Sequence, residues 1–193
     1  MSGIFEPDNA EIIRGQIARI LRDGIGSAAK ETEGREDAAD YKISVGIDTA
    51  VSQYVDNQRN PFPLADIHLD SVKIASGSAV VNKKNRTARF EILCMAEGNS
   101  TGGSFPWKRA NSRAWKTARV VRRILEAEEN TYLGLRGVVS AHSVTEMQAG
   151  QIDTESAVFV CAVKISLDVD FVEGVEVASG DALEAARTEI DSD

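Results

Sequence analysis

The sequence has few of the residues that build covalent or metal-held scaffolds, with two cysteines and two histidines among 193 residues. Cys94 and Cys161 lie far apart in apolar, strand-like segments, which indicates buried thiols in a reducing compartment and not a disulfide framework. His68 and His142 are also isolated, whereas a zinc site needs about four ligands at close spacing. We therefore expect no metal site and no structural disulfide.

Long apolar runs are absent as well. No segment approaches the roughly 18 consecutive apolar residues of a membrane-spanning helix. The segment from Met1 to Asp8 has neither the basic region nor the apolar region of a signal peptide. These observations predict a soluble protein that is made in a cytoplasm.

The charge balance is acidic and uneven. The chain has 30 acidic and 22 basic residues, a formal net charge of −8. Residues 146–193 hold 12 of the acidic residues and only 2 of the basic ones. Affinity for duplex DNA comes mostly from lysine and arginine that neutralise phosphates, and anionic membranes also attract basic surfaces. The composition therefore disfavours both as dedicated partners.

The first half of the chain predicts one helix and one strand around a polar insert. Asp8 can cap a helix over 10–23, and Gly24 and Gly26 provide an end. The polar and small residues of 26–40 then predict a mobile insert, because such residues cannot repay the entropy of ordering. Residues 41–47 alternate between apolar and polar, as a half-buried strand does.

The second half predicts most of a sheet. Periodicity favours strands at 67–75, 87–96, 138–147 and 157–171, of which the last two are expected to pair as an antiparallel hairpin, and a helix over 112–130. The chain is expected to be a single domain over 1–175, followed by an acidic extension over 176–193 that can form a short helix. The fold class predicted is α/β of the α+β type: a mostly antiparallel sheet packed by two main helices, with long loops.

Motifs for catalysis are sparse. The Gly-rich loop that begins at Gly98 and ends in the cluster Phe105-Pro106-Trp107 lacks the spacing of a phosphate-binding loop, and no nucleophile elbow is present. We expect no enzymatic activity and no cofactor. Asp168 and Asp170 point the same way on a strand, which is compatible with a bound cation but more typical of a solvated or subunit-facing stripe.

The predicted helix 112–130 has a basic face, although the chain as a whole is acidic. We interpret four of its residues and two acidic residues of the last strand as a subunit or partner interface, namely Arg113, Lys116, Arg119, Arg123, Asp168 and Asp170. A contact between unlike patches of neighbouring subunits is heterologous and closes into rings. Two alternatives stay open: a merely solvated helix face, and nucleic-acid binding, for which aromatic residues are sparse.

The order of elements resembles the tail terminator (tail completion) proteins of long-tailed bacteriophages over about residues 9–173. The segments that carry the resemblance are the helix 10–23, the entry Pro61-Phe62-Pro63, the strands 67–75 and 87–96, the helix 112–130 and the strand 157–171. The insert 26–40 and the acidic end of the chain depart from the pattern.

The resemblance implies a structural virion protein that forms a homo-oligomeric ring, expected to be a hexamer. This ring would cap the tail tube, join the tail to the head through a neck or head-completion protein, and let DNA pass through its lumen without specific binding. It would be assembled in the host cytoplasm and reside in the virion. Two alternatives remain: another neck or head–tail connector ring protein, and a non-viral ligand-binding or enzymatic α+β domain.

Overall fold

A five-stranded sheet forms the centre of the computed structural model, which describes residues 8–48, 62–74, 84–98, 105–152 and 159–173. Its strand order is β1-β2-β3-β5-β4. The strands are β1 (Ser44–Ile47), β2 (Leu64–Ile74), β3 (Lys84–Gly98), β4 (Val139–Ile152) and β5 (Phe159–Glu173). Only β1 pairs in parallel, with β2, and the other neighbours are antiparallel. The predicted fold class is confirmed, and so is the hairpin of the last two strands.

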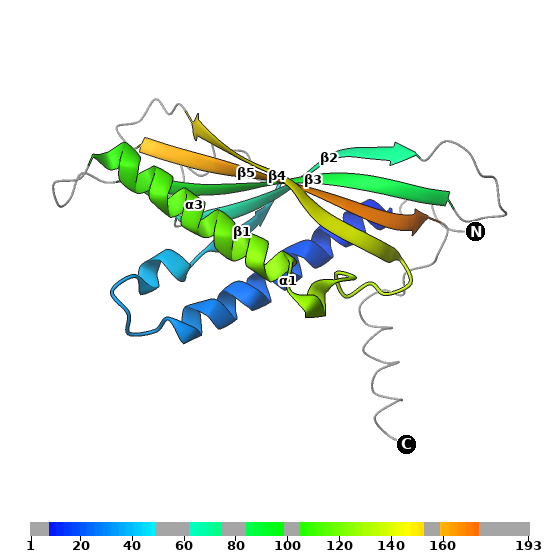
Figure 1. The fold of residues 1–193 in the computed structure, drawn as a ribbon, viewed down its shortest axis with the longest axis horizontal. Coiled ribbons are helices and arrows are strands. Elements are labelled where there is room, and N and C mark those ends of the chain that lie inside the picture. Colours follow the sequence, from blue (N-terminus) through cyan, green and yellow to red (C-terminus); the bar gives the residue numbers. More distant parts are fainter. Residues whose placement is uncertain (1–7, 49–61, 75–83, 99–104, 153–158, 174–193) are drawn as a thin grey trace, which may run out of the picture.

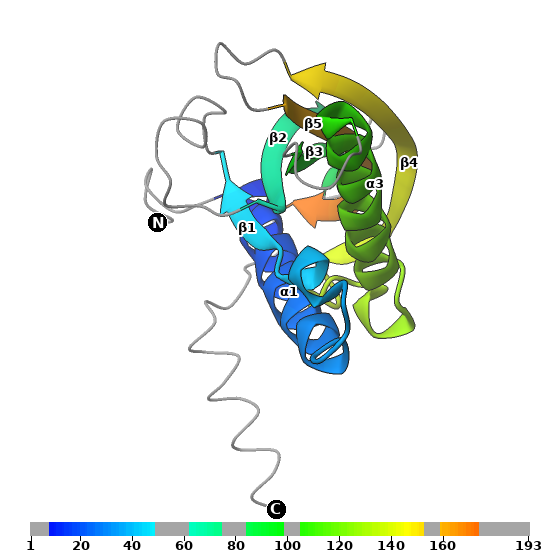
Figure 2. The same cartoon turned by 90° about the vertical axis from the view of Figure 1, so that its left-hand side faces the viewer.

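Two helices, α1 (Asn9–Glu31) and α3 (Pro106–Leu125), cover one face of this sheet (Figure 1). Seen from the end, the twisted sheet curves over α3 (Figure 2). The core lies between these layers and contains the apolar stripes of both helices and of the three central strands, including Ile13, Ile17, Leu21, Phe90, Ile92, Val121, Leu125, Ile165 and Leu167. Within the described ranges, neither helix has an apolar stretch that could cross a lipid bilayer.

Helix α1 is longer than predicted, because Gly24 and Gly26 do not end it. The Asp8 carboxylate accepts a hydrogen bond from the Glu11 amide at 2.9 Å, as the sequence predicted. The helix then continues to Glu31, with Ile25 buried in the next turn. Gly24 lies where α1 approaches α3, since a Cβ built there would be 2.7 Å from the Ile124 side chain. A missing side chain at this crossing serves close packing, not helix termination.

The boundaries of the predicted insert 26–40 change accordingly. Its first six residues belong to α1, and Ala38–Tyr41 forms the 3₁₀ helix η1. The predicted strand 41–47 is shorter than expected, because Tyr41 ends η1 and β1 begins at Ser44. Whether this segment is mobile stays a prediction.

Helix α3 begins six residues earlier than predicted and ends five residues earlier. Pro106 occupies the first turn, where its fixed φ suits a helix and its missing N–H costs nothing. Leu125 is the last helical residue, and Glu128–Asn130 forms the separate 3₁₀ helix η2. The predicted C-terminal extension 176–193 and most of the Gly-rich loop lie outside the described residues.

The alternation between buried and exposed residues in β5 begins only at Val163. From Val163 to Phe171 the odd-numbered residues are buried against the helices. At the start of the strand Phe159 is exposed and Val160 is buried instead. Val160 and its neighbours form a second, smaller apolar cluster on the other face, made of Leu64, Met95, Val160 and Ala162 with Phe62 and Leu93 at its border.

Candidate interaction surface

The interface residues predicted on α3 fall into two groups, of which the first serves the subunit itself. Arg113 Nε donates to Asp40 at 3.0 Å, and its Nη1 donates to the Glu97 carbonyl at 3.1 Å. Lys116 Nζ donates to Asp37 at 2.7 Å and to Asp40 at 3.2 Å. Arg113 and Lys116 therefore fasten the chain around η1 to α3 within one subunit. Their role in a subunit or partner interface stays a prediction.

Electrostatics at this contact follow from the same geometry. The Lys116 hydrogen bond, with help from Arg35, holds the pKa of Asp37 below its ordinary value although desolvation opposes the shift. Partial burial lowers the pKa of Lys116, but its hydrogen bonds to Asp37 and Asp40 outweigh burial, so the pKa of Lys116 is raised. The ammonium also lies 4.6 Å from the centroid of the Tyr41 ring, which adds a cation–π contact.

The second group, Arg119 and Arg123, remains exposed. Neither side chain forms an ion pair with another residue of the described ranges. Arg122 between them is paired with Glu126, one turn further along α3, at 2.8 Å. Arg119 and Arg123 are thus the predicted interface cations that stay available to a partner.

The predicted acidic partners lie on the opposite side of the subunit, on the face of the sheet that no described helix covers. Asp168 accepts two hydrogen bonds from Arg89 of β3, at 2.7 and 2.9 Å. Its pKa is lowered by those bonds, although partial burial opposes the shift, and the pKa of Arg89 is raised in return. Asp170 accepts from the Thr87 hydroxyl at 2.6 Å.

Other side chains on this open face are paired as well. Lys164 Nζ donates to Glu91 at 2.6 Å, which raises the pKa of that lysine. The pairs run across neighbouring strands β3 and β5, where facing side chains of opposite charge stabilise a sheet. Of the two predicted acidic interface residues, Asp168 is therefore already paired with Arg89, and Asp170 remains exposed beside Thr87.

The two histidines have different surroundings, and His68 lies beside two carboxylates. His68 Nδ1 lies 3.4 Å from Asp48 Oδ1, and its Nε2 lies 2.9 Å from Asp66 Oδ2 without the alignment of a hydrogen bond. Arg14 of α1 also pairs with Asp48, so these groups connect the first helix with the edge of the sheet. Each group in this network contacts another protein group.

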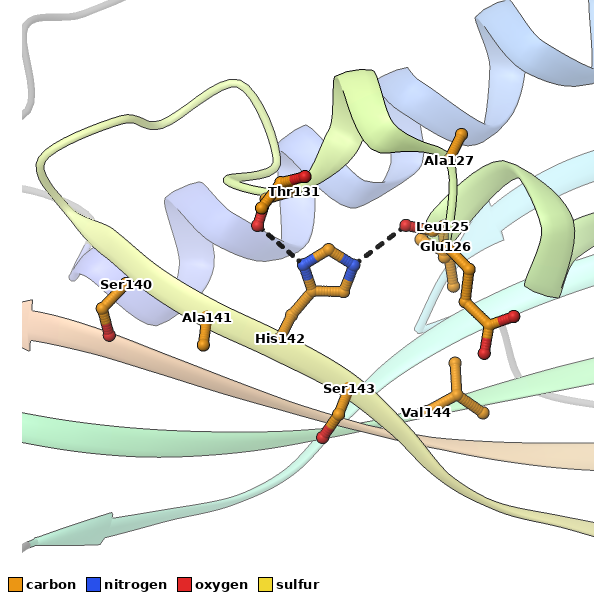
Figure 3. A pocket seen from close by; sticks show the side chains of 9 residues that line it. All are labelled: Leu125, Glu126, Ala127, Thr131, Ser140, Ala141, His142, Ser143 and Val144. Carbon is orange, nitrogen blue, oxygen red and sulfur yellow. Dashed lines mark hydrogen bonds between the residues drawn. The ribbon is translucent and has the colours of Figure 1, made fainter.

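His142 lines a concavity of about 390 Å³ between α3 and β4 (Figure 3). Its Nδ1 lies 3.1 Å from the Thr131 carbonyl and its Nε2 lies 2.9 Å from the Leu125 carbonyl. A neutral imidazole has one N–H, so only the doubly protonated ring donates to both oxygens. The ring joins the end of α3 and the following turn to β4.

Burial raises the pKa of the Cys94 thiol, which lies in the core, and also that of the half-buried Cys161. Among the described residues no cluster of three or more potential metal ligands occurs.

The start of α3 carries a surface that the sequence pattern did not single out as a site. Phe105 is 65% exposed and Trp107 is 50% exposed, and Phe159 at the start of β5 is 46% exposed. Single exposed apolar residues are ordinary, and three aromatic side chains at one end of a subunit make a candidate interaction surface. The cluster Phe105-Pro106-Trp107 is visible in the sequence, whereas the proximity of Phe159 is not.

Neither protein-family models nor curated proteins gave a match to this chain.

Proposed function

We propose that the protein is a structural virion component: a tail terminator that caps the tail tube of a long-tailed bacteriophage as a hexameric ring and joins the tail to the head. The α+β fold is what the resemblance of the sequence implied. The proposal assigns the protein no catalytic activity of its own. Its partners are further copies of the chain, the tail tube protein, and a neck or head-completion protein.

One observation carries this proposal. Arg119 and Arg123 are exposed on the helical layer and form no ion pair within the described residues. The nearby Arg113 and Lys116 form ion pairs with Asp40 and Asp37 of the same subunit. The helical layer and the open sheet face lie on opposite sides (Figure 1). A contact that joins different surfaces of neighbouring copies is heterologous, and such contacts close into rings when the rotation permits.

The charge of the chain supports passage of DNA without specific binding. The net charge is −8, and cations of the open sheet face such as Arg89 and Lys164 are already paired with carboxylates. Like charge suppresses binding of a polyanion. A lumen with this charge balance would let DNA move through it.

Charge reversal on α3 tests the proposal. Arg119→Glu with Arg123→Glu should leave the subunit folded, because neither side chain is buried, and should reduce the assembled mass measured by light scattering. The loss should be larger at low salt, where charges are screened less. The matched control is Arg19→Glu with Arg22→Glu, which reverses two exposed cations on α1.

Circular dichroism serves as the folding control for both variants. Wild-type particle mass for the α3 variant, at low and at high salt, would show that these arginines are only solvated. It would also remove the main support for the ring.

A further inference from the structure

Exposed aromatic side chains and one lysine form a compact surface where α3 begins, here named the start patch: Phe105, Trp107, Lys108 and Phe159. Lys108 Nζ lies 5.5 Å from the centroid of the Phe105 ring and 5.5 Å from that of Trp107. A cation over aromatic rings and a tryptophan half in solvent are features of energetically dominant positions in protein interfaces.

The start patch is held by rigid elements. Gly98, the last residue of β3, pairs with Phe159 of β5. A Cβ at Gly98 would lie only 1.9 Å from the Pro106 carbonyl oxygen, so the first turn of α3 rests directly on this strand end. The Cys161 thiol donates to the Trp107 carbonyl at 3.8 Å. Two strands and a helix therefore fix the aromatic residues relative to one another, which lowers the entropy cost of binding.

The opposite end of α3 carries the complementary chemistry, in a segment here named the exit turn: Glu128, Glu129 and Tyr132. Both glutamates are exposed, and neither carboxylate forms an ion pair within the described part of the chain. Tyr132 is 40% exposed, with the Arg136 guanidinium 5.8 Å from its ring centroid.

The exit turn is also fixed in place. Asn130 Nδ2 donates to the Ile124 carbonyl at 2.7 Å, and His142 bridges the carbonyls of Leu125 and Thr131 (Figure 3). The turn is thus fastened both to the end of α3 and to β4. Its acidic side chains are presented from a defined backbone.

We propose that the start patch of one copy docks on the exit turn of the next copy. A helix of 20 residues is about 30 Å long, so the two surfaces cannot meet within one subunit. In such a contact Lys108 and the aromatic side chains of one copy meet the glutamates and Tyr132 of the next, so the charges are complementary. Each junction would also contain Trp107 and Tyr132, and tryptophan and tyrosine are enriched among the residues that dominate interface energies. This inference rests on the proposed ring and adds two further surfaces to the junction between copies in which Arg119 and Arg123 are proposed to lie. A net charge of −8 favours a second copy over a nucleic acid as the occupant.

Two variants in the full chain separate the halves of this junction. Trp107→Ala with Phe159→Ser removes the start patch, and Glu128→Lys with Glu129→Lys reverses the exit turn. Each should stay folded and weaken self-association about thirtyfold or more, the scale of losing an interface hot spot. Val72→Ser is the matched control, because Val72 is 41% exposed outside both surfaces.

Mixing the two variants is the decisive step. Each retains the half that the other lacks, so an equimolar mixture should form dimers with one intact junction and nothing larger. Light scattering after size-exclusion chromatography distinguishes dimers from monomers and rings. Lys108→Glu should weaken assembly by itself and be rescued when Glu128→Lys is added to the same chain.

The outcomes separate this inference from the function it rests on. If wild type and both variants assemble alike, the start patch and exit turn are not the junction, while the ring stands. A mixture that stays monomeric, or a Lys108→Glu chain that is not rescued, overturns the pairing of these two surfaces. If wild type never associates, both proposals fail. If the wild type binds an oligonucleotide at physiological salt and replacement of Trp107 abolishes that binding, the start patch is a nucleic-acid site and the inference is overturned.

Discussion

Gly98→Ala is the substitution whose effect the structure defines most sharply. A methyl group there would lie 1.9 Å from the Pro106 carbonyl oxygen, 2.7 Å from its carbonyl carbon and 3.0 Å from the Ala110 amide nitrogen. All three atoms belong to the backbone, so no side-chain rotation relieves the overlap. The first turn of α3 would have to move by about an ångström away from β3.

Such overpacking costs about 3 kcal/mol, the upper part of the usual range, because buried Ala110 loses its contact with the sheet as well. The matched control is Gly15→Ala in α1, where nothing lies within 4 Å of the added methyl group. That change should stabilise the protein by about 1 kcal/mol through helix propensity. Urea unfolding followed by circular dichroism measures both. Equal stability of Gly98→Ala and wild type would refute the close approach of α3 to β3.

Two further predictions concern polar contacts. Arg89 lowers the pKa of Asp168, so the ionised carboxylate stabilises the fold at neutral pH, and this stability is lost as pH falls through the folded-state pKa. Asp168→Asn should therefore cost about 1 kcal/mol at pH 7 and nothing in strong acid. A cost independent of pH in urea titrations would contradict this. His142→Ala should cost about 1–3 kcal/mol, because the carbonyl of Leu125 or Thr131 that accepts the imidazole N–H loses its donor. An unfolding midpoint in urea equal to that of wild type would disprove this role of His142.

The elements that the sequence predicted well are those with a simple period. Strands β3 and β5 alternate over many residues, and the buried residues Ala114, Val121 and Leu125 recur along α3 at the spacing of one helix face. Glycines were harder to interpret from sequence. Glycine ends many helices, but Gly24 lies inside α1, where the Ile124 side chain of α3 leaves no room for a Cβ. This contact depends on tertiary packing, so local sequence rules cannot predict it.

The candidate interface shows the same limit. Sequence reasoning placed Arg119 and Arg123 correctly on an exposed face of α3. It could not show that Lys116 is bound to Asp37, which is 79 positions away, or that Arg89 neutralises Asp168 at the same separation. Exposure of the start patch depends on how the ends of β3, β5 and α3 meet. Pairing over such distances is set by the fold, so only the structure distinguishes occupied from available charges.

Electron microscopy of the purified full chain, alone and after incubation with isolated phage tail tubes, tests the central claim most directly. The proposed function predicts rings with a central hole, six-fold in end view, and the same rings seated at one end of the tubes. Monomers beside bare tubes would contradict it. Rings that bind portal-bearing heads and ignore tail tubes would instead identify a connector of the head.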